Sequence, residues 1–148
     1  MMNSTEVLLV EDNPTDAELT IKALLAAHLS NDIKHVMDGA EALDYIFCKG
    51  EYENREGNHP NLILLDLNMP RISGMDVIRE LKANEQTKTI PIIVLTSSNL
   101  DPDIATAYKL GVNSYIVKPV EFDQFAKSVA ELGHYWMLLN NSPSRRYL

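Results

Sequence analysis

The chain has 148 residues, of which 45% are hydrophobic and 23% are charged, and its formal net charge at pH 7 is −8. This composition is typical of one globular domain, and the acidic balance argues against nucleic acid as a direct partner, because phosphate backbones are bound by clustered Lys and Arg. No stretch reaches the roughly 18 apolar residues of a membrane span, and the single cysteine fits a reducing compartment, so we predict a cytoplasmic protein.

The first predicted unit is a strand followed by a helix. Residues 7–10 form a short apolar run, which is typical of a buried strand. Asn13 and Pro14 then supply a capping side chain and a proline for the first helical position, where the missing N–H costs nothing. Apolar residues at helical spacing predict the buried face of this helix, which consists of Ala17, Ile21, Leu24 and Leu25.

The second unit begins with a weaker strand over residues 33–37. Asp38 and Glu41 resemble a capping box that opens the next helix. The predicted buried face of that helix consists of Ala42, Leu43, Ile46 and Phe47. Cys48 is expected to pack on the same helix as a small side chain. Residues 50–61 are polar and rich in Gly, Asn and Glu, so they predict a long solvated loop.

Three more strand–helix units follow. Short apolar runs predict strands over 62–65, 92–95 and 114–117. The first of the three helices has the predicted buried face Val77, Ile78 and Leu81. The next helix is expected to begin at Asp101 and Pro102 and to end at Gly111, and the last to run over residues 121–138. Strands alternating with helices in this way predict an α/β fold, in which a parallel sheet is covered on both faces.

Charged residues follow three of the predicted strands. Glu11 and Asp12 come after the first, Asp66 after the third and Lys118 after the fifth. Because the carboxyl ends of parallel strands meet at one edge, these side chains are expected to share a crevice. Two carboxylates about 4 Å apart repel by roughly 4 kcal/mol at an effective dielectric near 20, so three of them must protonate, move apart or bind a cation. Mg²⁺ suits such a site, and the backbone carbonyl of Asn68 is a further candidate ligand.

Asp66 is the candidate for covalent chemistry, because it ends a wholly apolar run and is the best anchored of the three acids. A carboxylate can attack phosphorus and form an aspartyl phosphate. Phosphoryl transfer depends mainly on positioning and charge neutralisation, which Mg²⁺ and Lys118 would supply. Thr96, at the end of the fourth strand, can donate its hydroxyl to a phosphate oxygen.

With these residues, the chain resembles the response-regulator receiver domains of two-component signalling. The matching residues are Glu11-Asp12, Asp66-Leu67-Asn68-Met69-Pro70, Gly74, Thr96 and Lys118-Pro119. The resemblance implies a flavodoxin-like, doubly wound sheet of five parallel strands in the order 2-1-3-4-5 with five helices. It also implies a receiver domain over residues 5–139, which leaves residues 140–148 as a short polar tail.

The resemblance assigns a role to each site residue. It implies that Asp66 accepts phosphate from a sensor histidine kinase, and that Glu11 and Asp12 hold Mg²⁺ together with Asp66. Lys118 and Thr96 are then expected to contact the phosphate. Such a domain is a phosphoacceptor, which at most catalyses its own phosphorylation and dephosphorylation.

Further positions take regulatory roles by the same resemblance. Thr96 and Tyr115 are expected to form a switch, in which Thr96 moves toward the phosphate and Tyr115 turns inward behind it. Asn68 and Ser98 flank the phosphate, which implies that they tune its lifetime. The Lys118–Pro119 peptide is expected to be cis, and X–Pro is the only common place for such a bond.

Within the family, the chain most resembles the stand-alone response regulators of bacterial phytochromes. The hints are the 50–61 loop, the stretch Leu95-Thr96-Ser97-Ser98 and the stretch His134-Tyr135-Trp136. The implied partners are a sensor histidine kinase of the phytochrome kind and a downstream protein target. Apolar side chains at the end of the last helix extend beyond one face, so we also hypothesise a homodimer through the C-terminal helix region.

Three alternative functions have different sequence requirements. A phosphohydrolase of small phosphate esters usually has a second Asp two residues after its nucleophile, where this chain has Asn68, and a cap insertion, which the sequence lacks. A flavodoxin-like nucleotide binder needs a glycine-rich first turn, whereas residues 11–14 are acidic and contain no glycine. A degenerate receiver that only binds partners would lack part of the residue set described above.

Overall fold

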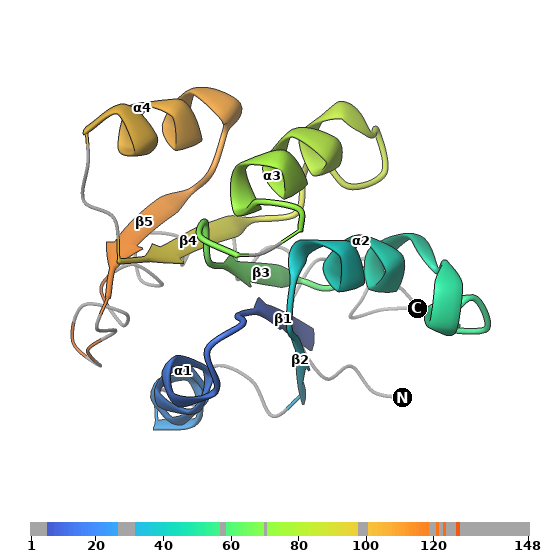
Figure 1. The fold of residues 1–148 in the computed structure, drawn as a ribbon, viewed down its shortest axis with the longest axis horizontal. Coiled ribbons are helices and arrows are strands. Elements are labelled where there is room, and N and C mark those ends of the chain that lie inside the picture. Colours follow the sequence, from blue (N-terminus) through green and yellow to red (C-terminus); the bar gives the residue numbers. More distant parts are fainter. Residues whose placement is uncertain are drawn as a thin grey trace, which may run out of the picture.

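The computed structural model describes residues 6–26, 32–56, 59–69, 71–97 and 101–118, together with 121, 123 and 127. These residues form one parallel sheet in the order β2-β1-β3-β4-β5, shown in Figure 1. The strands are β1 (Glu6–Val10), β2 (Asp32–Val36), β3 (Leu62–Leu65), β4 (Ile92–Thr96) and β5 (Ser114–Val117). The predicted strand order and parallel pairing are therefore confirmed.

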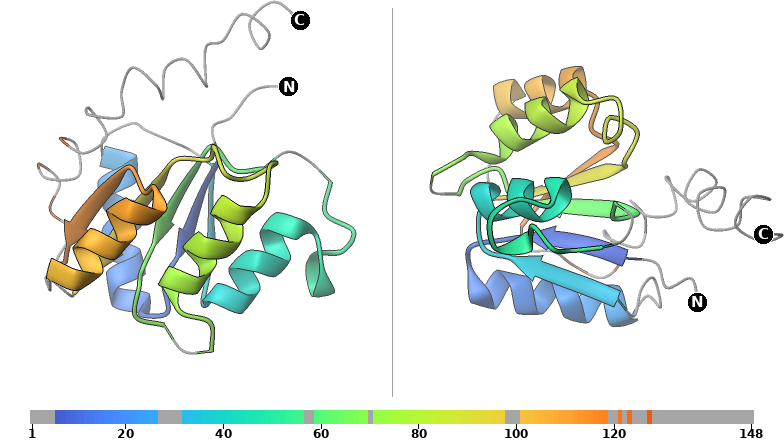
Figure 2. Two further views of the ribbon diagram at one scale, coloured as in Figure 1. Left: turned by 90° about the horizontal axis from the view of Figure 1, so that it is seen from above. Right: turned by 90° about the vertical axis from the view of Figure 1, so that its right-hand side faces the viewer.

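Helices cover both faces of this sheet. Within the described residues they are α1 (Pro14–Ala26), α2 (Gly39–Phe47), α3 (Gly74–Ala83), α4 (Asp101–Leu110) and a short 3-10 helix, η1 (Gly50–Tyr52). α1 lies on one face, and α2, α3 and α4 lie on the other (Figures 1 and 2). The described part of the chain thus has four α-helices where five were expected. The predicted fifth helix, over 121–138, and the polar tail fall almost wholly outside the described residues.

The hydrophobic core has two halves, one on each face of the sheet. Successive residues of a strand point to opposite faces. In β1, Leu8 and Val10 pack with α2, α3 and α4, whereas Val7 and Leu9 pack with α1, and all four side chains are fully buried. Burial on both faces is the reason why these strands are continuous apolar runs in the sequence. No helix in the described ranges is long and apolar enough to cross a membrane.

α1 begins as predicted but buries a different set of residues. Asn13 Oδ1 accepts the backbone N–H of Asp16 at 3.0 Å, so Asn13 is the capping residue. The buried residues of the helix are Ala17, Thr20, Ala23 and Leu24. The prediction that Leu25 is buried was wrong, since its side chain is 52% exposed. One residue rotates the helix by about 100°, so Leu24 and its neighbour cannot both face the sheet.

The cap of α2 is confirmed, but Cys48 lies elsewhere than predicted. Asp38 accepts the backbone N–H of Glu41 at 2.8 Å, while the Glu41 carboxylate accepts the N–H of Met37 at 2.9 Å, one residue before the usual partner in a capping box. Cys48 is not packed within the helix. It is the residue that ends α2, with a left-handed backbone at φ 55°, and its Sγ lies 3.5 Å from the carbonyl of Arg55.

The region after α2 is more ordered than the solvated loop that the sequence predicts. It begins with η1 and folds back onto α2. The rings of Tyr45 and Tyr52 meet edge to face, with centroids 5.1 Å apart, and the Arg55 guanidinium lies 4.1 Å from the Tyr45 centroid. Arg55 Nε also donates to the carbonyl of Tyr45 at 2.8 Å. Tyr52 and Arg55 therefore attach this segment to α2, while most of its other described residues are exposed to solvent, as predicted.

Helices α3 and α4 match their predicted signals closely. Val77, Ile78 and Leu81 form the buried face of α3. Gly111, with φ 103°, ends α4 in the left-handed conformation that favours glycine. α4 includes Asp101 as its first residue, whereas the sequence suggested Asp101 as the cap. This difference of one residue is common at helix ends.

Candidate functional site

The charged residues of the site leave the sheet from neighbouring strands. β1 and β3 pair in parallel register up to their last residues, so Glu11 and Asp66 emerge side by side. The N–H of Asp66 extends this pairing by donating to the carbonyl of Val10 at 3.1 Å. Beyond β4, the N–H of Lys118 donates to the carbonyl of Thr96 at 2.7 Å. The three strand ends therefore converge on one edge, as the sequence predicts.

Three carboxylates form an acidic cluster at this edge. One oxygen each from Glu11, Asp12 and Asp66 lies within 4.8 Å of the others. Glu11 and Asp66 are buried, whereas Asp12 is partly exposed. The N–H of Asn13 donates to Glu11 Oε2 at 3.1 Å and helps to orient that carboxylate. The cluster is therefore buried at Glu11 and Asp66 and accessible to water at Asp12.

The ammonium of Lys118 is in contact with three acids. Its Nζ lies 2.7 Å from Glu11 Oε1, 2.8 Å from Asp16 Oδ2 and 3.2 Å from Asp66 Oδ2. Sequence reasoning missed Asp16, which lies in the first turn of α1. Its place in the first turn of the predicted helix, three residues after the capping Asn13, keeps it near the end of β1, but nothing in the sequence indicates its partner.

These contacts shift the pKa values of the buried partners. Burial raises the pKa of Glu11 to about 7; the hydrogen bond from Lys118 opposes this rise, and the charge of Asp66 adds to it. Burial alone would lower the pKa of Lys118, but its hydrogen bonds to Asp16 and Glu11 and the charge of Asp66 outweigh burial and raise the pKa above its usual value. The lysine therefore stays charged at neutral pH.

The residues of the cluster fit a divalent metal ion. Carboxylate oxygens are the ligands that Mg²⁺ prefers, and this ion usually keeps several of its waters. The buried Glu11 and Asp66 supply fixed oxygens, and the partly exposed Asp12 leaves room for a hydrated ion. The single charge of Lys118 does not balance the surrounding acids, which favours a second cation. A contribution from the carbonyl of Asn68 stays a prediction.

The loop after β3 connects Asp66 to Thr96. The N–H of Asn68 donates to Asp66 Oδ1 at 3.1 Å, and Asn68 Nδ2 donates to Thr96 Oγ1 at 3.0 Å. Thr96 is fully buried at the end of β4. The predicted residues Asp66, Asn68 and Thr96 are thus joined by hydrogen bonds.

Gly74 allows this loop to close on the start of α3. A Cβ atom at this position would lie 2.3 Å from the carbonyl oxygen of Asp66 and 2.7 Å from the Cα of Leu67. The N–H of Gly74 donates to the carbonyl of Leu67 at 3.1 Å. Glycine is therefore required here by the close approach of the Asp66 and Leu67 backbone.

Of the remaining predicted site residues, the structure describes Tyr115 but not Ser98 or Pro119. Tyr115 lies on β5 opposite Val94, is partly buried and packs against the core on the α3 and α4 face. Its position is consistent with the predicted switch, which itself stays a prediction. Ser98 and Pro119 lie outside the described residues, and so does the predicted cis peptide.

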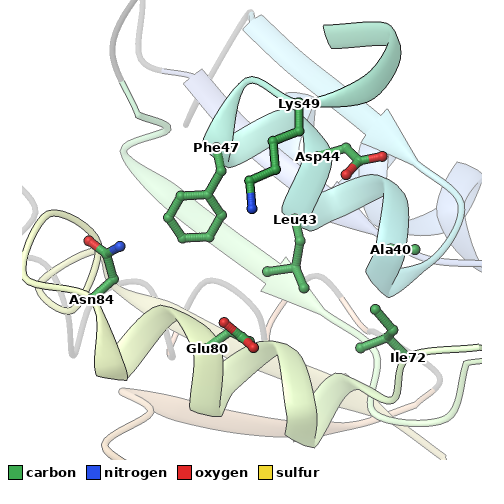
Figure 3. A pocket seen from close by; sticks show the side chains of 8 residues that line it. All are labelled: Ala40, Leu43, Asp44, Phe47, Lys49, Ile72, Glu80 and Asn84. Carbon is green, nitrogen blue, oxygen red and sulfur yellow. The ribbon is translucent and has the colours of Figure 1, made fainter. Parts of the chain in front are cut away.

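A separate groove lies between α2 and α3, and Figure 3 shows its side chains. Its volume is about 320 Å³, and it is lined by Ala40, Leu43, Asp44, Phe47, Lys49, Ile72, Glu80 and Asn84. None of these residues belongs to the acidic cluster. The groove is therefore a different surface from the candidate metal site.

Comparison with known proteins identifies the sequence pattern. The model of the response regulator receiver domain matches residues 7–130. The chain is 37% identical over 137 residues to the probable methanogenesis regulatory protein FilR2 of Methanothrix harundinacea, a match that covers 93% of this chain and 86% of that protein. It is also 37% identical over 131 residues to the response regulator Rcp1 of Synechocystis sp., covering 88% of each chain.

Solved structures of response regulators are also similar to this chain. The bacteriophytochrome response regulator RtBRR is 44% identical, with a TM-score of 0.83 over 98% of this chain and 86% of that one. The phosphorylated cyanobacterial phytochrome response regulator RcpA is 36% identical, with a TM-score of 0.77 over 95% and 99% of the two chains. The Mn²⁺-bound form of response regulator Rcp1 is 35% identical, with a TM-score of 0.70 over 93% and 96%.

Proposed function

Because the chain belongs to the family of response regulator receiver domains, we propose that it accepts a phosphoryl group on Asp66 from a sensor histidine kinase and uses Mg²⁺ to do so. One observation carries this proposal: Glu11, Asp12 and Asp66 converge with Lys118 at one edge of the sheet. A relative solved in its phosphorylated form and another with bound Mn²⁺ support it.

Asp66 is suited to act as the acceptor. Asn68 donates a backbone N–H to one carboxylate oxygen, and Lys118 lies beside the other, so the group is held from both sides. In the transfer, an Asp66 oxygen attacks phosphorus, the P–N bond to the kinase histidine breaks, and its electron pair stays on the imidazole nitrogen. Mg²⁺, held by Glu11, Asp12 and Asp66, would neutralise charge on the phosphoryl oxygens. Lys118 supplies a further fixed positive charge.

The response to phosphorylation passes from Asp66 to the neighbouring strands. A phosphoryl group adds an anion beside Thr96, whose hydroxyl can donate to it. Thr96 then leaves the amide of Asn68, and the space behind it becomes available to Tyr115 on β5. Both arrangements exist before phosphorylation, and the new charge changes their populations. Asn68 and Ser98 tune the lifetime of the phosphate in this proposal.

The partner that the comparisons favour is a phytochrome-type sensor kinase, because RtBRR and RcpA are both named as phytochrome response regulators. We assign residues 5–139 to the receiver domain and residues 140–148 to a polar tail. The output is contact with a downstream protein, and a homodimer through the C-terminal helix region is part of the proposal. We place the protein in the cytoplasm, where such kinases phosphorylate their targets.

The decisive experiment is labelling of the purified full chain with radioactive acetyl phosphate. We expect Mg²⁺-dependent, acid-stable and alkali-labile label on the wild type, and none on Asp66→Asn. Asp76→Asn is the matched control, since it removes an aspartate that is 59% exposed on α3 and lies outside the cluster. This control should label like the wild type.

Two results would contradict the proposal. Label that persists on Asp66→Asn would exclude Asp66 as the acceptor, and label that forms in excess EDTA would exclude a metal ion at the cluster. Rapid and saturable hydrolysis of small phosphate esters by the wild type would instead favour a phosphohydrolase.

A further inference from the structure

The ammonium of Lys118 lies among three carboxylates. Its distances to Glu11, Asp16 and Asp66 are 2.7, 2.8 and 3.2 Å. The three partners differ in their access to water. The side chain of Glu11 is fully buried and that of Asp66 is 5% exposed, whereas that of Asp16 is 35% exposed.

A phosphoryl group on Asp66 takes the place of one of the three carboxylates, and it then shares the ammonium with Glu11 and Asp16. The ammonium is held best by the phosphoryl group if one of these two remaining contacts is released. A buried carboxylate that loses its partner cannot regain water, which is costly. Asp16 can be hydrated where it stands, and its position in the first turn of α1 favours a negative charge. Of the three acids, Asp16 is therefore the one whose contact with Lys118 is easiest to break.

We propose that Asp16 is a positioning residue that holds the Lys118 ammonium in the unphosphorylated protein and competes with the phosphoryl group for it. The inference rests on the proposed function, because it concerns the same acceptor site. It adds a residue in α1 to a site otherwise built from the ends of β1, β3, β4 and β5. In this role Asp16 weakens the hold of the protein on the phosphoryl group and shortens the lifetime of the phosphorylated form.

The test compares two variants of α1 that lose the same charge. Asp16→Asn keeps the size of the side chain and removes its charge. Glu18→Gln removes one charge from the same helix, at a side chain that is 67% exposed and pairs with Lys22 at 3.2 Å. Asp16→Ala is the second test variant. Each full-length protein is titrated with beryllofluoride, a phosphoryl mimic, at saturating Mg²⁺, and the half-life of radioactive phosphate on Asp66 is measured.

We expect beryllofluoride affinity to rise about three-fold in Asp16→Asn and Asp16→Ala, the size typical of a partly exposed ion pair, and the phosphate half-life to lengthen by a similar factor. Glu18→Gln should match the wild type. A spectroscopic measurement tests the contact without phosphorylation. The side-chain ammonium signal of Lys118 in ¹⁵N NMR should be sharp in the wild type and broadened by water exchange in Asp16→Asn.

Three results would overturn the inference. Wild-type affinity and half-life in Asp16→Asn would show that no competition exists. Weaker beryllofluoride binding in that variant would show that Asp16 assists the phosphoryl group. An equal rise in Glu18→Gln would assign the effect to net charge. In all three cases the wild type would still be labelled on Asp66, so the proposed function would stand, whereas an unlabelled wild type would end both.

Discussion

The side-chain amide of Asn68 donates to the hydroxyl of Thr96, with 3.0 Å between Nδ2 and Oγ1. Asn68 belongs to the loop after β3, and Thr96 is the last residue of β4. Asn68 also donates its backbone N–H to Asp66 Oδ1, so this one residue connects the threonine hydroxyl to Asp66. A movement of the hydroxyl toward a phosphoryl group would break this hydrogen bond, and the exposed side-chain amide of Asn68 can then return to water.

Replacement of Thr96 by valine should leave the phosphorylation of Asp66 intact and abolish most of the response of Tyr115. We expect Thr96→Val to be labelled on Asp66, and its free energy of unfolding to change by less than about 1 kcal/mol, because the exposed Asn68 amide regains water. The NMR shift of Tyr115 on beryllofluoride binding should be strongly reduced. Thr87→Val is the control, since it removes another buried hydroxyl, bonded to the Leu81 carbonyl at 2.7 Å. A full Tyr115 response in Thr96→Val would contradict the switch.

Binding of Mg²⁺ to the acidic cluster should stabilise the folded protein. An ion that binds only the folded chain raises its free energy of unfolding with concentration, so the melting temperature of the wild type should rise as Mg²⁺ is added. Asp66→Asn should lose most of this rise. Without Mg²⁺ it should melt no lower than the wild type, because one of three clustered charges is gone. Thermal melts with and without Mg²⁺ measure both effects, and an equal rise in the variant would argue against the site.

We expect position 74 to accept only glycine, because no side chain fits there. We expect Gly74→Ala to lower the free energy of unfolding by roughly 1–3 kcal/mol, since a Cβ would meet backbone atoms of Asp66 and Leu67 that cannot move freely. The labelling rate should fall as well, because the acceptor shifts. Gly111→Ala is a useful contrast: its cost comes from a positive φ, and the atoms nearest to its Cβ would belong to the flexible side chain of Lys82, at 3.5 Å or more. Wild-type labelling is expected there.

The cap of α2 should give stability a dependence on pH. Burial acts to raise the pKa of Asp38, but the N–H of Glu41 and the guanidinium of Arg71 outweigh it and hold the pKa below its usual value. A lowered pKa means that the folded state favours the charged form. The stabilisation is therefore complete above the usual aspartate pKa and is lost as pH falls through the folded value.

We expect Asp38→Ala to cost about 1 kcal/mol at pH 7, as is typical of a lost cap, and the cost to shrink as the pH falls below 4. Denaturant titrations at several pH values measure this difference. Ser73→Ala supplies the comparison, because Ser73 caps α3 through an uncharged hydroxyl, 3.2 Å from the N–H of Asp76. Its penalty should not depend on the ionisation of the cap. A constant penalty for Asp38→Ala would contradict the assignment.

Local signals predicted most of the fold. The bounds of β3 and β5 agree with the predicted runs over 62–65 and 114–117, because a strand buried on both faces is marked by its own apolar residues. The caps at Asn13 and Asp38 could also be predicted from local sequence, because the donor and the acceptor of each cap hydrogen bond are three residues apart. The exposure of Leu25 could not be predicted, since adjacent leucines fit the helical pattern equally well and only the position of the sheet distinguishes them.

The sequence by itself determined the alternation of strands and helices and the charges at the strand ends, because both depend on residues close together along the chain. Only the tertiary structure decided that Asp16 shares Lys118 with the acidic cluster, across 102 positions, that Asn68 holds Thr96, and that Arg55 packs on Tyr45. Such contacts depend on how loops and helices return to the sheet, and no local spacing encodes that geometry.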